Sequence, residues 1–402
     1  MHARLSAPLM VVLLCGCAIA MLSFGVRSAF GLFMEPLSVA RGWPRDYFSF
    51  AIALQNLCWG LSQPIAGMFA DRYGPRVVLL FGGVLYAGGT ALMSIAADPV
   101  MLYVSGGVLV GFGMGAASYI TVLAAFSQIM PADVRSWALG LATAAGSLGQ
   151  FLIVPIGQAV MTATDWQTAA IALAASIAAI PFLALALQRP ARAHRAGAGV
   201  PLSVAVARAL GNRDFVLLAS GFFVCGFQLA FITVHFPAYL ADHGINPTVA
   251  AWSIGLIGLL NIAGGYVAGV LGARHSRKNL LTLIYLGRGL AIAAFLLMPL
   301  STPSVLLFGA ALGVLWLATV PLTSGVVGAI FGTQYIATLF GLVFLSHQVG
   351  SFFGVWLGGA LYERTGSYDL IWWMTVALSL IAAALNWPIR ERPLVLKPLA
   401  AA

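Results

Sequence analysis

Charged side chains are scarce in this chain of 402 residues, and their scarcity bounds the class of protein. Only 8% of the residues are Asp, Glu, Lys or Arg, whereas 61% are hydrophobic, and the mean hydropathy is +0.98. A soluble domain carries about 25% charged residues. The composition therefore excludes a large soluble core and predicts a protein with many membrane-spanning helices.

Acidic residues are scarcer than basic ones, with 11 Asp and Glu against 20 Lys and Arg. A basic excess can indicate a nucleic-acid partner, but the distribution of the charges argues against one here. Arg27 and Arg288 lie inside apolar segments, and almost all the other basic residues lie in short connections. Positive-inside orientation explains this pattern. We expect a lipid bilayer as partner and no nucleic acid.

Cysteine is also rare, and its four positions are Cys15, Cys17, Cys58 and Cys225, all within apolar segments. Cys15 and Cys17 are two residues apart, so on a helix they point to different sides and do not form a metal-binding pair. No spacing of a nucleophile and a base stands out. We expect no metal, no cofactor and no enzymatic activity.

Apolar segments long enough to cross a bilayer, about 20 residues each, occur twelve times. They cover residues 9–38, 46–66, 77–97, 99–129, 136–163, 167–188, 215–241, 248–272, 279–299, 303–331, 335–362 and 369–389. The first follows Arg4 and resembles a signal peptide. It continues far beyond the apolar core of such a peptide, so we interpret it as an uncleaved first helix.

Twelve spans place both termini on one side of the membrane. If that side is the cytoplasm, fifteen Lys and Arg residues fall inside, and three fall outside, namely Arg41, Arg45 and Arg364. The positive-inside rule favours this orientation. We expect a multi-pass protein of the bacterial inner membrane with cytoplasmic termini.

One long connection, residues 189–214, divides the chain into two predicted six-helix bundles at 1–188 and 215–402. We expect residues 200–210 within it to form a short helix on the membrane surface. The two halves repeat, because a shift of 202 residues places Gly67 on Gly269 and Arg72 on Arg274. Six helices per half make the repeat parallel, which puts a substrate site between the halves near the midplane.

The connection after the second span reads Gly67-Met-Phe-Ala-Asp71-Arg72-Tyr-Gly74-Pro-Arg76. It resembles the GxxxDRxGxR signature of the major facilitator superfamily at all five fixed positions. The resemblance implies an all-α membrane fold of twelve helices and transport by alternating access. We expect Gly67, Asp71, Arg72, Gly74 and Arg76 to form a conformational latch, which we call the signature latch. The alternative is a basic loop with one acid.

Nearly the whole chain is similar to the monocarboxylate transporter group and its bacterial oxalate/formate-exchanger-like relatives. In that group a lysine of the first helix precedes a Phe-rich turn, and Arg27 in FGVRSAFGLFMEP occupies the matching place. The animal members carry an Asp and Arg pair in the eighth helix, whereas Asn261 and Gly265 stand at the corresponding positions here. The resemblance implies monocarboxylate transport, with any proton coupling carried by other residues.

A guanidinium in the middle of a membrane helix costs about 3 kcal/mol on insertion scales. We interpret Arg27 as the point that binds an anionic substrate. The alternatives are that it caps carbonyls or pairs with Glu35 two turns later. Arg288 either supplies a second positive charge to the substrate or braces the ninth helix against its neighbours.

Other polar and aromatic residues fall on helices expected to line the cavity. The substrate-binding candidates besides the two arginines are Phe30, Asn56, Trp59, Tyr119, Gln228, His235, Thr319, His347 and Gln348. The candidates for proton coupling are His235, His347 and Glu35. Each residue also has a structural interpretation, as a packing group or an interhelical hydrogen-bonding group.

These observations predict a monomeric secondary active transporter of small organic anions, specifically monocarboxylates, with a proton as co-substrate. The second hypothesis is an efflux transporter of drugs or other apolar compounds, in which Arg27 would matter little. A third is a non-transporting sensor on the same fold.

Overall fold

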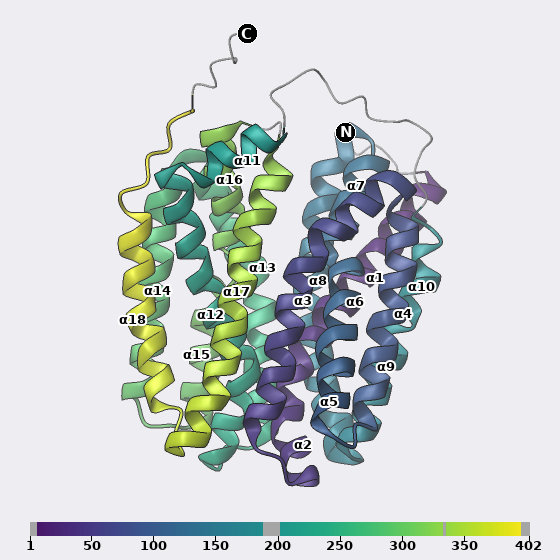
Figure 1. Cartoon of the computed structure of the whole chain (residues 1–402), viewed down its shortest axis with the longest axis vertical. Helices are drawn as coiled ribbons and strands as arrows, with labels where there is room; N and C mark the ends of the chain where they lie inside the picture. Colours follow the sequence, from purple (N-terminus) through teal and green to yellow (C-terminus); the bar gives the residue numbers. More distant parts are fainter. Residues whose placement is uncertain (1–5, 188–201, 333–334, 395–402) are drawn as a thin grey trace.

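The computed structural model describes residues 6–187, 202–332 and 335–394, and the regular structure within these ranges is helical. Two groups of helices stand side by side, and the first and last described residues lie at the same end of the molecule (Figure 1). We call this end the terminal end and the opposite one the distal end. This arrangement agrees with an even number of membrane crossings.

The first group holds ten α-helices, a 3-10 turn (η1) and a π-helical turn (η2). They are α1 Ala7–Ala29, η1 Phe30–Phe33, α2 Met34–Arg41, α3 Arg45–Tyr73, α4 Pro75–Ser94, α5 Pro99–Leu102, η2 Tyr103–Leu109, α6 Val110–Ala116, α7 Tyr119–Ile129, α8 Ala132–Ala163, α9 Trp166–Ile177 and α10 Ala179–Ala184.

The second group follows a connection of which only part is described. It comprises α12 Arg213–Asp242, α13 Pro247–Arg274, α14 Arg277–Leu297, α15 Thr302–Leu315, α16 Thr319–Phe331, α17 Ile336–Thr365 and α18 Asp369–Asn386. The described part of the connection contains α11, Leu202–Leu210, so a helix forms where one was expected. The rest of the predicted 189–214 linker, up to residue 201, lies outside the described residues. The boundaries of the two bundles stay a prediction.

The predicted all-helical membrane fold is confirmed. Within the described ranges, eleven helical segments are long and apolar enough to cross a bilayer. The remaining predicted span corresponds to α3, which has 29 residues and is therefore long enough. Its lower hydropathy comes from polar side chains such as Gln55, Asn56 and Gln63, which an internal helix tolerates because α3 packs against α6 and α17.

Four of the spans are interrupted. The first passes through η1, the fourth breaks between α6 and α7, the sixth between α9 and α10, and the tenth between α15 and α16. At the second break Ser118 caps α7 by accepting a hydrogen bond from the Thr121 N–H. Breaks of this kind free backbone groups at membrane depth, so they occur where protein or a cavity surrounds them.

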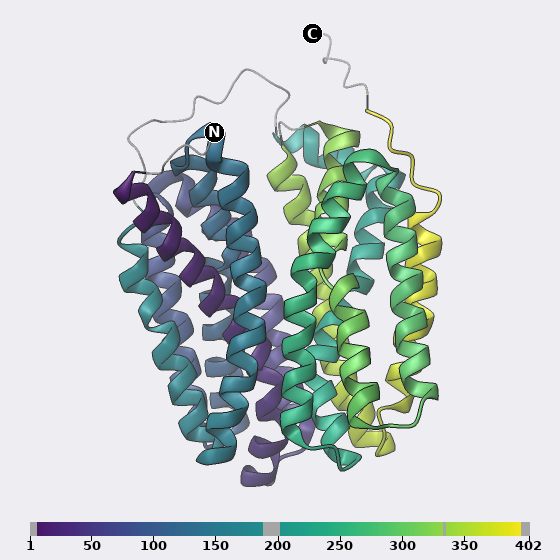
Figure 2. The same cartoon turned by 180° about the vertical axis from the view of Figure 1, so that it is seen from behind.

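The two groups touch at the distal end and in the middle of the molecule (Figures 1 and 2). Gly31 of η1 lies so close to α12 that a Cβ there would meet the backbone oxygen of Thr233. Between α3 and α17, Gly60 lies against Gln348, whereas a Cβ at Gly67, two turns nearer the terminal end, would meet nothing. The structure therefore shows a conformation that is sealed at the distal end.

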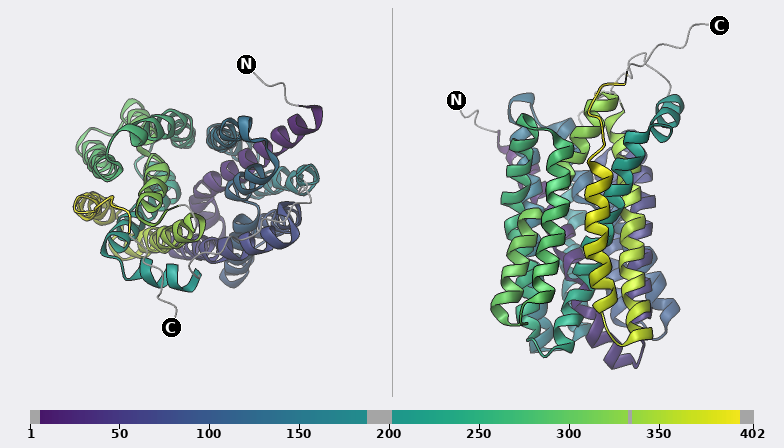
Figure 3. Two further views of the ribbon diagram at one scale, coloured as in Figure 1. Left: turned by 90° about the horizontal axis from the view of Figure 1, so that it is seen from above. Right: turned by 90° about the vertical axis from the view of Figure 1, so that its left-hand side faces the viewer.

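Figure 3 shows the same two groups from the terminal end, with α17 next to α3 at the boundary between them. The outward faces of both groups carry large exposed apolar side chains, such as Phe81, Phe182, Leu290 and Leu297. Such a surface is suited to lipid rather than water. Buried polar side chains such as Asn56 of α3 and Gln348 of α17 lie at the boundary between the groups, where the candidate site is.

Candidate functional site

Arg27 lies on α1 one turn before the 3-10 turn that interrupts the first span. Its guanidinium carbon is 4.7 Å from the ring centroid of Trp59 and 5.7 Å from that of Phe24. Among the described residues, no hydrogen bond or ion pair reaches its side chain. Two aromatic faces thus hold this cation by cation–π attraction, and its donors stay free. Neither structural alternative, carbonyl capping or pairing with Glu35, is realised.

A narrow space of about 10 Å³ adjoins this guanidinium. It is lined by Ser23, Phe24, Arg27, Trp59, Met114, Ser118 and Tyr119. Such a space is close to the minimum for one water molecule. In this conformation the Trp59 ring lies against the cation, and the space beside them is too small for a carboxylate.

Ring contacts lead from Arg27 across the boundary into the second group. Trp59 packs edge-on against Phe344 of α17, at 5.4 Å between ring centroids, and Phe344 stacks on His347 at 5.7 Å. His347 Nδ1 is 3.0 Å from Oε1 of Gln348, whose Nε2 donates to the backbone oxygen of Asn56. The structure thus brings six candidates together, namely Arg27, Asn56, Trp59, Tyr119, His347 and Gln348.

Asn56 contributes an unusual group to this region. Its Nδ2 donates to the backbone oxygen of Ile52 on the same helix, at 2.8 Å. Its Oδ1 is buried and has no hydrogen-bond partner among the described residues. An unpaired buried acceptor is costly unless water or a ligand satisfies it.

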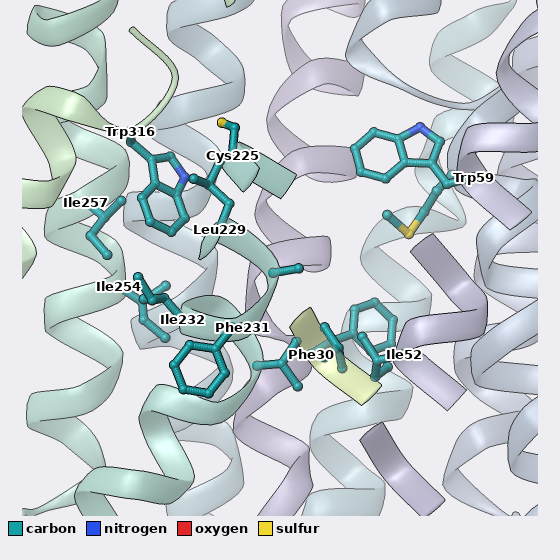
Figure 4. Close-up of a cluster of buried hydrophobic side chains, with 14 of the residues drawn as sticks. Phe30, Ile52, Trp59, Cys225, Leu229, Phe231, Ile232, Ile254, Ile257 and Trp316 are labelled. Carbon is teal, nitrogen blue, oxygen red and sulfur yellow. The ribbon is translucent and has the colours of Figure 1, made fainter. Parts of the chain in front are cut away.

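Phe30, Gln228 and His235 lie away from the Arg27 space. Phe30 is buried and lies beside Ile52 below Trp59 (Figure 4). Gln228 donates to α18, at 2.5 Å from Ser379 Oγ and 2.9 Å from the Thr375 oxygen. Gln228 and His235 do share a face of α12, but this face meets α17 and α18 instead of the Arg27 space.

His235 is fully buried near the distal end. Its Nε2 is 2.8 Å from the backbone oxygen of Val355, and its Nδ1 is 3.2 Å from the Tyr368 hydroxyl. Both ring nitrogens are therefore engaged, which is the geometry of a structural hydrogen-bonding group.

Arg288 and Thr319 belong to a second cluster at the break between α15 and α16. Arg288 is only 1% exposed, and its donors reach the carbonyls of Leu315 and Trp316 and the Cys225 sulfur, the last at 3.2 Å. The break leaves these carbonyls without helical partners, and the guanidinium satisfies them. These contacts agree with the alternative in which Arg288 braces the ninth helix, and a contact of Arg288 with substrate stays a prediction. Trp316, Cys225 and Leu229 lie together there (Figure 4).

Glu35, the third proton-coupling candidate, lines a separate cavity of about 340 Å³ near the distal end. Gln158, Asp165 and Trp166 line the same cavity. The hydrogen bond from the Thr168 N–H lowers the pKa of Asp165. This cavity is distinct from the Arg27 space, because none of its lining residues is shared with it.

The distal seal was not predicted from the sequence. Arg45 at the start of α3 forms two hydrogen bonds of 2.6 Å with the Asp242 carboxylate at the end of α12. Its backbone N–H donates to Glu363, and its guanidinium lies 4.4 Å from the Tyr362 ring centroid. Burial acts to lower the pKa of Arg45, but the hydrogen bonds from Arg45 to Asp242 and Tyr368 raise it overall.

We call Arg45, Asp242, Glu363 and Tyr368 the distal clasp. The Tyr368 hydroxyl is within hydrogen-bond distance of both Arg45 and His235 Nδ1. It therefore connects the distal clasp to a buried residue of α12. The available sequence signal was weak: a cation opens one span, and an acid closes another on the same side of the membrane. Which of the distal charges meet is decided only by packing.

The signature latch is only partly described. Gly74 has a φ of 88°, which glycine adopts readily, and it separates α3 from α4. Arg72 is exposed, with its guanidinium carbon 5.2 Å from the ring centroid of Tyr73. The side chain of Asp71 lies outside the described residues. Arg76 follows at the start of α4, and the latch role of this motif stays a prediction.

The family model of the Major Facilitator Superfamily matches residues 16–352, with a second match over residues 218–401. The chain is 26% identical over 396 residues to the uncharacterized MFS-type transporter YcxA of Bacillus subtilis (strain 168), which covers 94% of this chain and 92% of that protein. It is 27% identical over 356 residues to monocarboxylate transporter 13 of Rattus norvegicus, covering 86% and 81% of the two chains.

Solved structures share the fold. A D-xylose-proton symporter superposes with a TM-score of 0.74 at 15% sequence identity, covering 96% of this chain and 100% of that one. A bacterial homolog to the human lysosomal transporter Spinster, in an inward-facing and unoccupied conformation, also gives a TM-score of 0.74, at 16% identity, covering 95% and 97%. At these identities the likeness concerns the fold alone.

Proposed function

This chain belongs to the major facilitator superfamily and is a multi-pass membrane transporter, and on that premise we propose that it carries small organic anions, specifically monocarboxylates, by alternating access. One observation carries the proposal. Arg27 is a cation at membrane depth that no described acid neutralises, beside a space that a ligand can enlarge by moving Trp59. An intramembrane ionisable residue without a partner is by default functional.

The chemistry of the Arg27 space suits a carboxylate with an apolar portion. A guanidinium offers two parallel N–H donors that match the two oxygens of a carboxylate. With Trp59 moved aside, Phe24, Met114 and Tyr119 would enclose the rest of the substrate. No acidic side chain lines this space, so an ammonium group would find no partner there. The relatives named monocarboxylate transporters support the same substrate class.

Alternating access requires the distal clasp to open and the terminal end to close. Because the distal end is sealed in the present conformation, a substrate would reach Arg27 from the terminal end once Trp59 moves aside, and we propose that this end is the cytoplasmic side of a bacterial inner membrane. The residues at 1–188 and 215–402 would then move as the two halves of a monomer. The Trp59–Phe344 contact joins the halves beside the Arg27 space, so displacement of Trp59 would also alter the boundary between them.

Co-transport of a proton would make the step electroneutral and avoid a cost of about 2.3 kcal/mol per charge at 100 mV. Of the three candidates, His347 lies closest to the proposed binding site, through Phe344 and Trp59. Since a proton would then be a substrate, uptake should rise as the pH on the uptake side falls. Measuring uptake into proteoliposomes with imposed pH gradients checks whether uptake rises or falls as the pH is lowered.

The decisive experiment uses the purified protein in proteoliposomes with labelled lactate and pyruvate. We expect Arg27→Ala to lower uptake about 100-fold, with Arg364→Gln, an exposed cation on the distal end, as the matched control. The aromatic lining of the Arg27 space favours the competing function, efflux of apolar compounds. If Arg27→Ala retained transport of an apolar dye and wild type carried no carboxylate, that second function would replace the proposal.

A further inference from the structure

The second half of the chain contains a degenerate copy of the signature motif. The shift of 202 residues places Asp71 on Ala273 and Arg76 on Lys278, so the second copy lacks its acid. In the structure a carboxylate is nevertheless present. Glu391, beyond α18, accepts hydrogen bonds from Ser276 Oγ and from the backbone N–H of Lys278, both at 2.8 Å.

Glu391 stands at the N-terminus of α14, where helix geometry favours a negative charge. The first N–H groups of a helix lack intrahelical partners, and the helix dipole is positive there. Ser276, the residue before α14, does not cap the helix with its own hydroxyl but donates that hydroxyl to Glu391. Arg277 also lies 3.5 Å from the Glu391 carboxylate. The acid thus caps α14 from a distant part of the chain.

The same contact reaches α16, the terminal-end part of the tenth span. The Arg277 side chain runs over Gly325 so closely that a Cβ at Gly325 would meet its Cδ and Nε. Three residues after Glu391, the N–H of Leu394 donates to the Ile330 oxygen near the end of α16, at 2.7 Å. Residues 387–394, which we call the C-terminal segment, therefore tie α16 to α14.

α14 lies at the outer edge of the second group, where it carries exposed apolar residues such as Leu283 and Leu290. Figure 1 shows α14 and α18 on the side of the second group that faces away from the first. Because α14 and α16 belong to the same half, a tie between them would restrain a separate inward bending of the terminal end of α16 toward the first group. Such bending would add to the movement of the two halves when the terminal end closes.

We propose that Glu391 supplies the acid missing at position 273, and that the C-terminal segment thereby holds the terminal end of the transporter open. Glu391 is a positioning residue: it acts through Arg277 and α16 and does not touch substrate. The proposal requires alternating access but no particular substrate, so it survives if the carboxylate proposal fails.

The test measures closing directly, without substrate. Cysteines are introduced at Gly140 of α8 and Gly269 of α13, where added side chains meet nothing within 4 Å. Both positions lie about two turns beyond Ser147 and Asn261, which are hydrogen-bonded across the halves. Cys15, Cys17 and Cys58 are replaced by serine, the buried Cys225 is kept, and a short bismaleimide cross-links the pair.

We expect Glu391→Gln to raise the cross-linking rate at least threefold, because the terminal end then closes more often. Arg392→Gln, an exposed neighbour without a hydrogen bond or ion pair among the described residues, should leave the rate unchanged. Adding Ala273→Asp to Glu391→Gln should return the rate toward wild type, an effect that a merely structural role of Glu391 would not produce.

A second variant tests the proposal in case the Glu391→Gln protein does not fold. Leu394→Pro removes one N–H donor and keeps the carboxylate, and it should raise cross-linking by a smaller factor. If the cross-linking rate is unchanged in Glu391→Gln, the C-terminal segment does not hold the terminal end open. If Glu391→Gln does not fold, an unchanged cross-linking rate in Leu394→Pro leads to the same conclusion. If Glu391→Gln raises the cross-linking rate and adding Ala273→Asp does not lower it again, Glu391 does not replace the acid missing at position 273.

Discussion

Arg27 and Arg288 both lie deep within membrane-spanning segments, away from the ends of the spans, and they differ in what surrounds them. Arg288 is almost completely buried, and its guanidinium donates to two carbonyls and to the sulfur of Cys225. Arg27 is partly buried, faces two aromatic rings, and has no hydrogen-bond partner among the described residues. The two arginines therefore differ in whether their N–H donors are free for a ligand, which their position within the membrane spans does not show.

The internal repeat gives Arg288 a counterpart in the first half. Under the shift of 202 residues, Arg288 corresponds to Tyr86 and Cys225 to Ser23. In the first half the Tyr86 hydroxyl donates to the Ser23 oxygen at 3.2 Å, as Arg288 donates to Cys225 in the second. Both side chains brace the third helix of their half against its first helix.

The largest expected effect is on carboxylate uptake, which should depend on Arg27 and much less on Arg288. Arg27→Ala should lower carboxylate uptake about 100-fold, because loss of a buried charge partner costs about 2–5 kcal/mol. The melting temperature should hold or rise, since an unpaired cation is removed. Uptake into proteoliposomes and thermal unfolding in detergent check both. If the melting temperature of Arg27→Ala fell by many degrees, Arg27 would be a structural residue and would not differ in role from Arg288.

Arg288→Met should show the reverse pattern. Removing the guanidinium leaves the carbonyls of Leu315 and Trp316 buried and unpaired, at a cost of about 1–3 kcal/mol each. We expect a clear loss of thermal stability, measured by unfolding in detergent. If instead Arg288→Met kept its stability and lost only carboxylate binding, the second arginine would be a substrate group after all.

A smaller effect concerns the two ends of the molecule. Arg45→Gln removes a charge-assisted pair with Asp242, worth about 1.5–3 kcal/mol, and should shift the population toward the distal-open conformation about tenfold. Maleimide labelling of a cysteine at Phe352, which packs against Phe50 across the boundary, reports the opening. Arg364→Gln serves as the matched control, and equal labelling in both variants would argue against the clasp.

The smallest expected effect concerns the ring in front of Arg27. Trp59→Phe weakens the cation–π contact by about 0.5–1 kcal/mol and should tighten binding of a small carboxylate up to about threefold, because less attraction opposes its entry. Isothermal titration with pyruvate measures the change. Trp43→Phe, a tryptophan near the distal end, is the control. Weaker binding in Trp59→Phe would mean that the ring holds substrate rather than competing with it.

The candidate site was predictable in part. Arg27 stood out because a lone cation in a long apolar segment needs no tertiary information to be noticed, and Trp59 and Tyr119 lie beside it as expected. Helical spacing could not show that Gln228 and His235 face α17 and α18, since a buried helix has polar partners on every side. Nor could it show Met114 and Ser118 in the Arg27 space, which depend on the break between α6 and α7.

By itself the amino-acid sequence determined the membrane spans, the even number of crossings and the superfamily, because apolar length and a loop motif are properties of contiguous residues. Only the tertiary structure decided that Arg27, and not Arg288, keeps its N–H donors free. It also decided that Glu391 lies at the second, degenerate copy of the signature motif. Those answers depend on carbonyls released at a helix break and on a glutamate more than a hundred residues away. Such partners meet only when the helices pack.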